Sequence, residues 1–449
     1  MARLLDLPPE VIGKIYDWLR AIEQPTRYDV RNPLYTWQFN SNALRPYTQA
    51  YRFRHVVLNN RRALEQFAAS VTRSPALGAA VRTLIAVVRI APGEEGEPIA
   101  GLVETLAVMW RSLGGVRFVR IRMFRVGIES LLVAVERGLE LPLLEEMEAI
   151  CTQDDWGDWD NPYDVPTWRT IVEAAPRLAN LKIYLNFQGP GPDGLTAPPV
   201  VPCAPFRSNL KQLDVYDYPA AHEPAMTNLI NSFPDLRSLV LNSEMQTTQL
   251  TTLPLLRLAN LRELNWEWLG VDEGATPIAR LDVRHFAALE RVTLAVQPCL
   301  PSFHFALPPA TTRLTVEIDN EVPLAALTSL VTPGSKHFHP NLTHIKLHLP
   351  YAYDRGAQIE NLSLEEMVEN EMDAAFAMDW TEAVSREGLE ELIRAAGERG
   401  VELTGTCTAA LRVEEAARVR AERAGPEGED LDAAGGWVGS VVLEGLDWI

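Results

Sequence analysis

The amino-acid sequence predicts an α/β solenoid: irregular repeats that form a curved parallel sheet with helices, after a small helical module. Three observations predict this fold. One short apolar pattern recurs along most of the 449 residues, its copies are spaced by about one strand and one helix, and the strands alternate apolar with polar residues. The composition is that of a globular chain, since 47% of the residues are hydrophobic and 22% are charged.

The recurring pattern places apolar residues at its first, fourth and sixth positions, as L-x-x-L-x-L. Its copies are 22 to 31 residues apart, close to the spacing of about 20–29 in leucine-rich repeats. One strand and one helix cannot bury their own apolar face, so neighbouring units must stack into one core. We therefore predict an irregular leucine-rich-repeat solenoid of about ten units over residues 61–407. The clear copies centre on Leu213, Leu239, Leu264, Val292 and Ile345, weaker ones on Leu84, Val119, Leu181 and Leu314, and a doubtful one covers Leu144–Met147.

The strand segments indicate a sheet with one wet face. In HIKLHL (344–349) every second residue is apolar, whereas parallel strands covered on both faces are apolar throughout. The intervening residues would face a target on the concave side, and Arg120 and Arg122 would suit an acidic or phosphorylated peptide. The predicted target-binding residues are Arg120, Arg122, Lys182, Tyr184, Asp214, Tyr216, Glu263, Asn265, Glu267, His344, Lys346 and His348.

The N-terminal segment LPPEVIGKIYDWL (7–19) predicts an amphipathic helix. Two prolines suit a first helical turn, Glu10 suits the positive helix end, and the apolar residues fall on one face. The segment resembles the start of an F-box, and 45–58 is similar to the segment that closes many fungal F-boxes. With the repeats that follow, the order resembles the fungal F-box/leucine-rich-repeat domain protein family. The resemblance to the F-box start is carried by Leu7, Pro8, Glu10, Val11, Ile15 and Leu19.

The resemblance implies a substrate-recognition adaptor of a cullin-based, SCF-type ubiquitin ligase. Such a chain docks on a Skp-type adaptor protein and holds a protein target on its repeats, while the chemistry takes place on other subunits. We expect an F-box-like helical module over residues 1–60, the solenoid over 61–407, and a C-terminal helix with an acidic tail over 408–449, in cytoplasm or nucleus. The implied adaptor-docking residues are Leu7, Pro8, Val11, Ile12, Ile15 and Leu19.

Two alternatives stay open. Residues 21–44 lack the second-helix signature of an F-box, so the chain can be a non-ligase interaction scaffold with a degenerate F-box, whose first helix caps the solenoid. The second is a phosphate- or nucleic-acid-binding module, because residues 45–125 hold 13 Arg against 5 Glu. The net charge of −19, of which residues 351–449 carry −15, disfavours nucleic acid as a partner.

Other classes of function find little support in the sequence. We expect no enzyme and no cofactor, because no catalytic motif is present and the four cysteines lie far apart. No apolar run approaches the length of about 20 residues that crosses a bilayer, and the N-terminus lacks a secretory pattern. The acidic loop 154–160 lacks the ligand spacing of a calcium site, and the histidines of 337–348 lack that of a zinc site.

Overall fold

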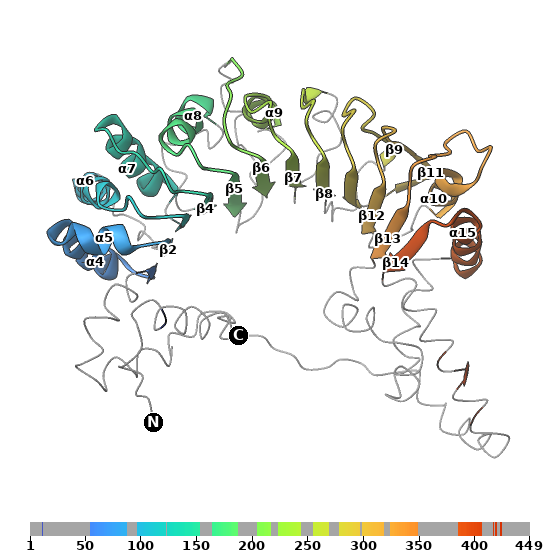
Figure 1. The fold of residues 1–449 in the computed structure, drawn as a ribbon, viewed down its shortest axis with the longest axis horizontal. Helices are drawn as coiled ribbons and strands as arrows, with labels where there is room; N and C mark the ends of the chain where they lie inside the picture. Colours follow the sequence, from blue (N-terminus) through green and yellow to red (C-terminus); the bar gives the residue numbers. More distant parts are fainter. Residues whose placement is uncertain are drawn as a thin grey trace. The chain divides into compact units, whose positions relative to one another are not determined.

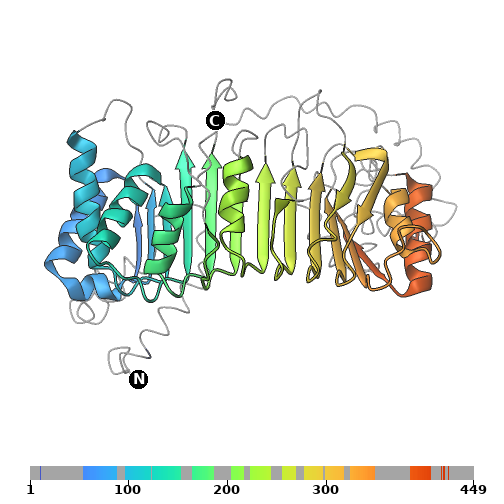
Figure 2. The same ribbon diagram turned by 90° about the horizontal axis from the view of Figure 1, so that it is seen from above.

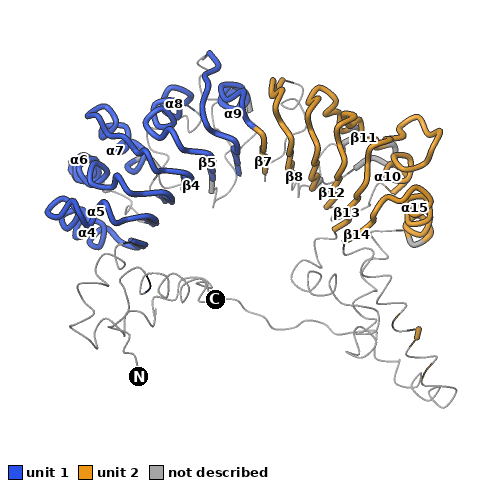
Figure 3. Tube along the Cα trace, viewed as in Figure 1, with its two compact units in different colours: residues 1–236 blue, residues 237–449 orange. Residues whose placement is uncertain are grey.

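The chain divides into two compact units, Met1–Leu236 and Arg237–Ile449. Figure 3 colours them separately. The computed structural model describes residues 11, 54–87, 97–122, 124–152, 164–186, 204–216, 223–243, 255–268, 278–296, 299–317, 324–348, 385–405, 416, 418–419 and 423.

Unit 1 is a parallel sheet covered on one face by helices. Its strands follow one another in chain order, and every strand pairing given for this unit is parallel. Figures 1 and 2 show its helices on the same face of these strands. The strands are β1 (His55–Leu58), β2 (Thr83–Val87), β3 (Phe118–Arg122), β4 (Glu146–Thr152), β5 (Asn180–Asn186) and β6 (Gln212–Tyr216). The helices are α4 (Arg61–Arg73), α5 (Pro75–Ala80), α6 (Glu97–Arg111), α7 (Phe124–Glu136), α8 (Val165–Ala174) and α9 (Glu223–Asn231).

The same pair of backbone hydrogen bonds joins the segments that precede successive strands of unit 1. The carbonyl of Arg82 accepts hydrogen bonds from the N–H groups of Arg117 and Phe118, at 2.8 and 3.0 Å. The carbonyl of Arg117 accepts in the same way from Glu145 and Glu146, at 2.8 and 3.1 Å. This repeated pair of hydrogen bonds fixes the register of each strand on its neighbour, so the apolar positions of successive repeats coincide.

The apolar positions of the pattern form the core between sheet and helices. In β3, Val119 and Ile121 are at most 1% exposed. The alternating residues Phe118, Arg120 and Arg122 lie on the other face and are only partly buried. Helix α8 begins where the Asp164 side chain accepts a hydrogen bond from the backbone N–H of Thr167, and it buries Trp168 completely. The helices therefore cover one face of the sheet and leave the polar face to other contacts.

Unit 2 continues the repeats with fewer helices among its described residues. Its parallel sheet consists, in neighbour order, of β7 (Ser238–Ser243), β8 (Glu263–Trp268), β10 (Arg291–Val296), β12 (Arg313–Glu317), β13 (His344–His348) and β14 (Glu402–Gly405). Two helices, α10 (Leu324–Val331) and α15 (Arg386–Arg399), precede β13 and β14. Helix α15 begins at the capping side chain of Ser385 and ends at Gly400, whose φ of 73° suits glycine.

The expectation of one helix in every unit is wrong. One extended segment, β9 (Ile278–Asp282), lies between β8 and β10, and another, β11 (Cys299–Ala306), lies between β10 and β12. The two segments pair in parallel as a separate sheet. Phe303 and Phe305 are buried and lie two residues apart, which is the period of a strand and not of a helix. Extended chain can thus bury apolar side chains where other repeats use a helix.

Every predicted copy of the apolar pattern corresponds to a strand. The doubtful copy at Leu144–Met147 is part of this set, because Met147 lies in β4 and both residues are fully buried. Strand β1 lies within the residues assigned to the N-terminal module and pairs with β2. Among the described residues, no helix has both the length and the apolar character needed to cross a membrane.

Candidate functional site

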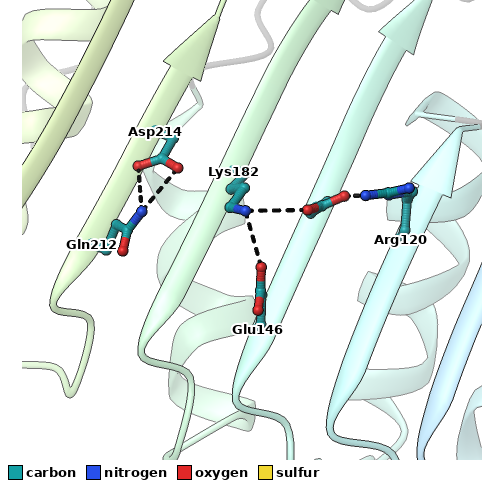
Figure 4. A network of polar contacts seen from close by, with 6 residues as sticks. Arg120, Glu146, Lys182, Gln212 and Asp214 are labelled. Carbon is teal, nitrogen blue, oxygen red and sulfur yellow. Dashed lines mark hydrogen bonds and ion pairs between the residues drawn. The ribbon is translucent and has the colours of Figure 1, made fainter. Parts of the chain in front are cut away.

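The candidate site is the sheet face of unit 1 that its helices leave uncovered, here called the open face. It consists of the side chains of β1–β6 that alternate with the buried apolar ones, and Figure 4 shows part of it with the helices behind the strands. The parallel register places one residue of each strand in each row across the sheet. The middle row contains, from β1 to β6, Val57, Ile85, Arg120, Glu148, Lys182 and Asp214. The next row toward the carboxyl ends of β2–β6 contains Val87, Arg122, Ile150, Tyr184 and Tyr216.

Glu148 is the centre of an ion-pair network on the open face. It is only 3% exposed. One of its carboxylate oxygens accepts a hydrogen bond from Nε of Arg120, and the other lies 3.3 Å from Nζ of Lys182. Lys182 also contacts Oε1 of Glu146 at 3.1 Å (Figure 4). Positive and negative groups therefore alternate across β3, β4 and β5, and each cation in the network already has an anionic partner.

Asp214 continues this row on β6 with a different partner. Asp214 is 2% exposed, and its carboxylate oxygens each lie 3.0 Å from Nε2 of Gln212, which donates to them. Burial raises the pKa of Asp214 above its ordinary value, although the hydrogen bonds from Gln212 and the charge of Lys182 act in the opposite direction. For Lys182, burial acts to lower the pKa. The hydrogen bonds and charges of Glu146 and Glu148 together outweigh burial, so the pKa of Lys182 is raised overall.

Two tyrosines form a flat aromatic surface beside the charged row. The rings of Tyr184 and Tyr216 are stacked, with centroids 4.3 Å apart and planes within 3° of parallel. Burial, followed by the charge of Glu148, raises the pKa of Tyr184, so its hydroxyl stays protonated at neutral pH. Rigid, partly buried tyrosines beside polar groups are typical of surfaces that bind other proteins.

The strands of unit 2 place the remaining predicted residues on their own polar face. Glu263 forms an ion pair with Arg291 on the next strand. Nδ1 of His344 lies 3.2 Å from a carboxylate oxygen of Glu402, and its Nε2 lies 3.2 Å from Oγ1 of Thr404. By register, Asn265 and Glu267 lie on β8 opposite residues of β10, and Lys346 and His348 lie on β13 opposite residues of β12.

The histidines near β13 have structural partners. Nε2 of the buried His339 lies 2.9 Å from the carbonyl oxygen of Pro308, and the ring of His337 packs on that of His304. Within the described ranges, no three His, Cys, Asp or Glu side chains come together as a metal site would require. The acidic loop 154–160 lies outside the described residues.

The structure brings together six of the predicted target-binding residues on the open face of unit 1. Arg120 was expected to bind an acidic target and is instead bonded to Glu148. The sequence reasoning did not select Glu146, Glu148 or Gln212. The alternation in EEMEAI, with Met147 and Ala149 as its apolar positions, was the signal that could have located the two glutamates.

The docking residues Leu7, Pro8, Ile12, Ile15 and Leu19 lie outside the described residues, whereas Val11 is helical and 39% exposed.

Comparisons with known proteins add little to this geometry. No protein-family model matches the chain, and no curated protein matches it. Among solved structures, the chain is similar to a chain in the crystal structure of the Rad7 and Elc1 complex in yeast. The sequence identity is 12%, the match covers 78% of this chain and 94% of that one, and the TM-score is 0.22. A likeness that weak does not bear on function.

Proposed function

We propose that this chain is a substrate-recognition adaptor of a cullin-based, SCF-type ubiquitin ligase, and that it binds a protein target on the open face of unit 1. In this proposal the chain acts by binding and not by catalysis, in the cytoplasm or the nucleus. Its N-terminal segment docks on a Skp-type adaptor protein, and its repeats hold the target.

The observation that supports target binding best is the arrangement of the open face. Four neighbouring strands, β3–β6, present charged and aromatic side chains there, and no described helix covers them. The ion pairs of Glu148 hold the side chains of Arg120 and Lys182 in place before any partner arrives. Preorganised side chains lose less entropy on binding, which favours recognition of a partner protein.

The docking part of the proposal is supported by the resemblance of residues 7–19 to the start of an F-box. The apolar face of that helix would dock on the adaptor protein through Leu7, Pro8, Val11, Ile12, Ile15 and Leu19. Val11, the one docking residue within the described part of the chain, is helical with 39% of its surface exposed. An exposed apolar residue on a helix fits a surface that becomes buried against a partner.

The test is co-purification of the full chain with a Skp-type adaptor protein. The variant Ile15→Glu/Leu19→Glu places two carboxylates on the apolar face and should abolish capture, because buried unpaired charges cost several kcal/mol. A matched control, Lys14→Glu/Arg20→Glu, places two carboxylates on the polar face and should retain capture. Circular dichroism verifies that both variants keep their secondary structure.

Stoichiometric capture that only the apolar-face variant loses would support the adaptor role. Failure of the well-folded native chain to capture the adaptor protein would refute the ligase proposal. The chain would then be a leucine-rich-repeat interaction scaffold with a degenerate F-box, in which the N-terminal helix caps the repeats.

A further inference from the structure

Arg122 differs from the other cations in the network region of the open face. Arg120 and Lys182 are both bonded to Glu148. In the part of the chain that the structure describes, Arg122 forms no hydrogen bond or ion pair, and its Nε is buried without an acceptor. The buried Nε leaves the guanidinium without a bonded anion among the described residues, and the terminal nitrogens of the same group are not among the buried unpartnered atoms, so an incoming acceptor would bind to those terminal nitrogens.

The surroundings of Arg122 are apolar. Its register partner on β2 is Val87, and Ile85 lies on the same face two residues earlier. Ile85 in turn pairs with Val57 on β1, which is 54% exposed. On the other side, Ile150 of β4 follows two residues after Glu148 on the same face. Arg122 is therefore a cation within a strip of aliphatic side chains, where a charge-assisted hydrogen bond is stronger than in open water.

We propose that Arg122 binds a carboxylate of a target protein, from an Asp or Glu flanked by aliphatic side chains that pack on Val57, Ile85, Val87 and Ile150. This inference rests on the proposed function of the open face as the target-binding surface. It names the class of target segment: an extended segment in which one acidic residue lies between apolar ones. The charge of Arg122 supplies the complementarity, because the neighbouring cations are already neutralised.

The same surroundings disfavour a nucleic acid as the occupant. A phosphate backbone would bring several negative charges past the glutamates of β4 and the buried Asp214, within a chain of net charge −19. A single carboxylate makes one favourable contact with Arg122 and leaves the aliphatic strip for the side chains beside it. A protein segment therefore satisfies both parts of this surface.

The test measures binding of labelled nonapeptide libraries to the full chain by fluorescence anisotropy. One library has a central Glu flanked by Val, Leu, Ile or Phe, and two matched libraries have Gln or phosphoserine at the centre. A single-stranded RNA of random sequence is the fourth probe. The Glu library should bind about 10- to 100-fold more tightly than the Gln library, which is the range for a hydrogen bond to a charged group.

The variant Arg122→Gln should abolish the difference between the Glu and Gln libraries. The matched control is Arg117→Gln, which removes the same charge five residues earlier, at an exposed ion pair with Glu145. That control should keep the preference. Equal binding of the Glu and Gln libraries, no binding of either, or an unchanged preference in Arg122→Gln overturns the inference. Tighter binding of phosphoserine peptides or RNA through Arg122 overturns the assignment of a carboxylate.

The two proposals fail in different experiments. A chain that captures the Skp-type adaptor protein but shows no preference for Glu peptides keeps its ligase role and loses the specificity assigned to Arg122. A chain that prefers Glu peptides but does not capture the adaptor protein keeps the open face as a binding surface and loses the ligase role.

Discussion

Replacing Glu148 by glutamine removes the carboxylate at the centre of the open-face network while keeping its shape. The carboxylate is bonded to Arg120 and Lys182, and a glutamine has one oxygen to offer, so one cation would face an amide N–H₂. Hydrogen bonds to charged groups contribute about 1.5–3 kcal/mol when buried. The Arg120 and Lys182 side chains are 41% and 24% exposed, so water replaces part of this. We expect a loss of about 1–2 kcal/mol in the local stability of β3–β5.

Hydrogen exchange measured by mass spectrometry on peptides from β3, β4 and β5 tests this expectation, because it reports local opening. A loss of about 1–2 kcal/mol corresponds to exchange faster by about 5- to 30-fold. The control is Glu145→Gln, three residues earlier, which makes the same charge change. Glu145 is 50% exposed and 3.8 Å from Arg117, so its removal should change exchange by less than about threefold.

The comparison of the two variants decides the outcome. Equal exchange in Glu148→Gln and in the native chain would show that the network does not stabilise the sheet. Equal acceleration in both variants would show that burial of Glu148 has no special effect. Either result would refute the claim that the ion pairs hold the open face in place before a partner binds.

Two further predictions concern particular positions. Burial raises the pKa of Asp214, so its ionised form destabilises the fold at a pH above both the folded and the unfolded pKa, and this penalty disappears below the unfolded pKa of about 3.9. Asp214→Asn should therefore raise the urea midpoint at pH 7 and have no such benefit at pH 3.5. Gly405→Ala should weaken the pairing of β14 with β13 by about 1–3 kcal/mol, because φ is 108° there and a Cβ would overlap the backbone of Leu347. Faster hydrogen exchange in β14 would verify it, and unchanged exchange would contradict it.

The strands were predictable because each repeat signals its own apolar positions. Leu181 and Leu213 belong to copies of one pattern, and both are fully buried in adjacent strands. The elements between strands were less predictable, because either a helix or an extended segment can bury the same number of apolar side chains. Phe303 and Phe305 show this in β11, which lies where a helix was expected.

The partners on the open face could not be read from the sequence. Alternation within β3 indicates that Arg120 lies on the polar face, and this was correct. Its ion pair with Glu148, 28 residues later in the chain, depends on the register between β3 and β4. Repeat lengths vary, and the copy around Met147 is weak, so the sequence did not indicate which residue would lie beside Arg120. The neighbours of a side chain across the sheet depend on where each strand begins, and variable repeat lengths hide this in the sequence.

The register of the sheet also limits how a target can lie on it. Neighbouring strands are about 4.8 Å apart, so each row of the open face presents one side chain at that interval. In an extended peptide, side chains that point the same way are about 6.8 Å apart. When a peptide crosses the strands, its side chains therefore align again with the side chains of the sheet only after about three strand spacings, which correspond to about four peptide residues. Between those points its side chains fall between rows, so only two separated positions of such a peptide can align fully with side chains of the six strands of unit 1.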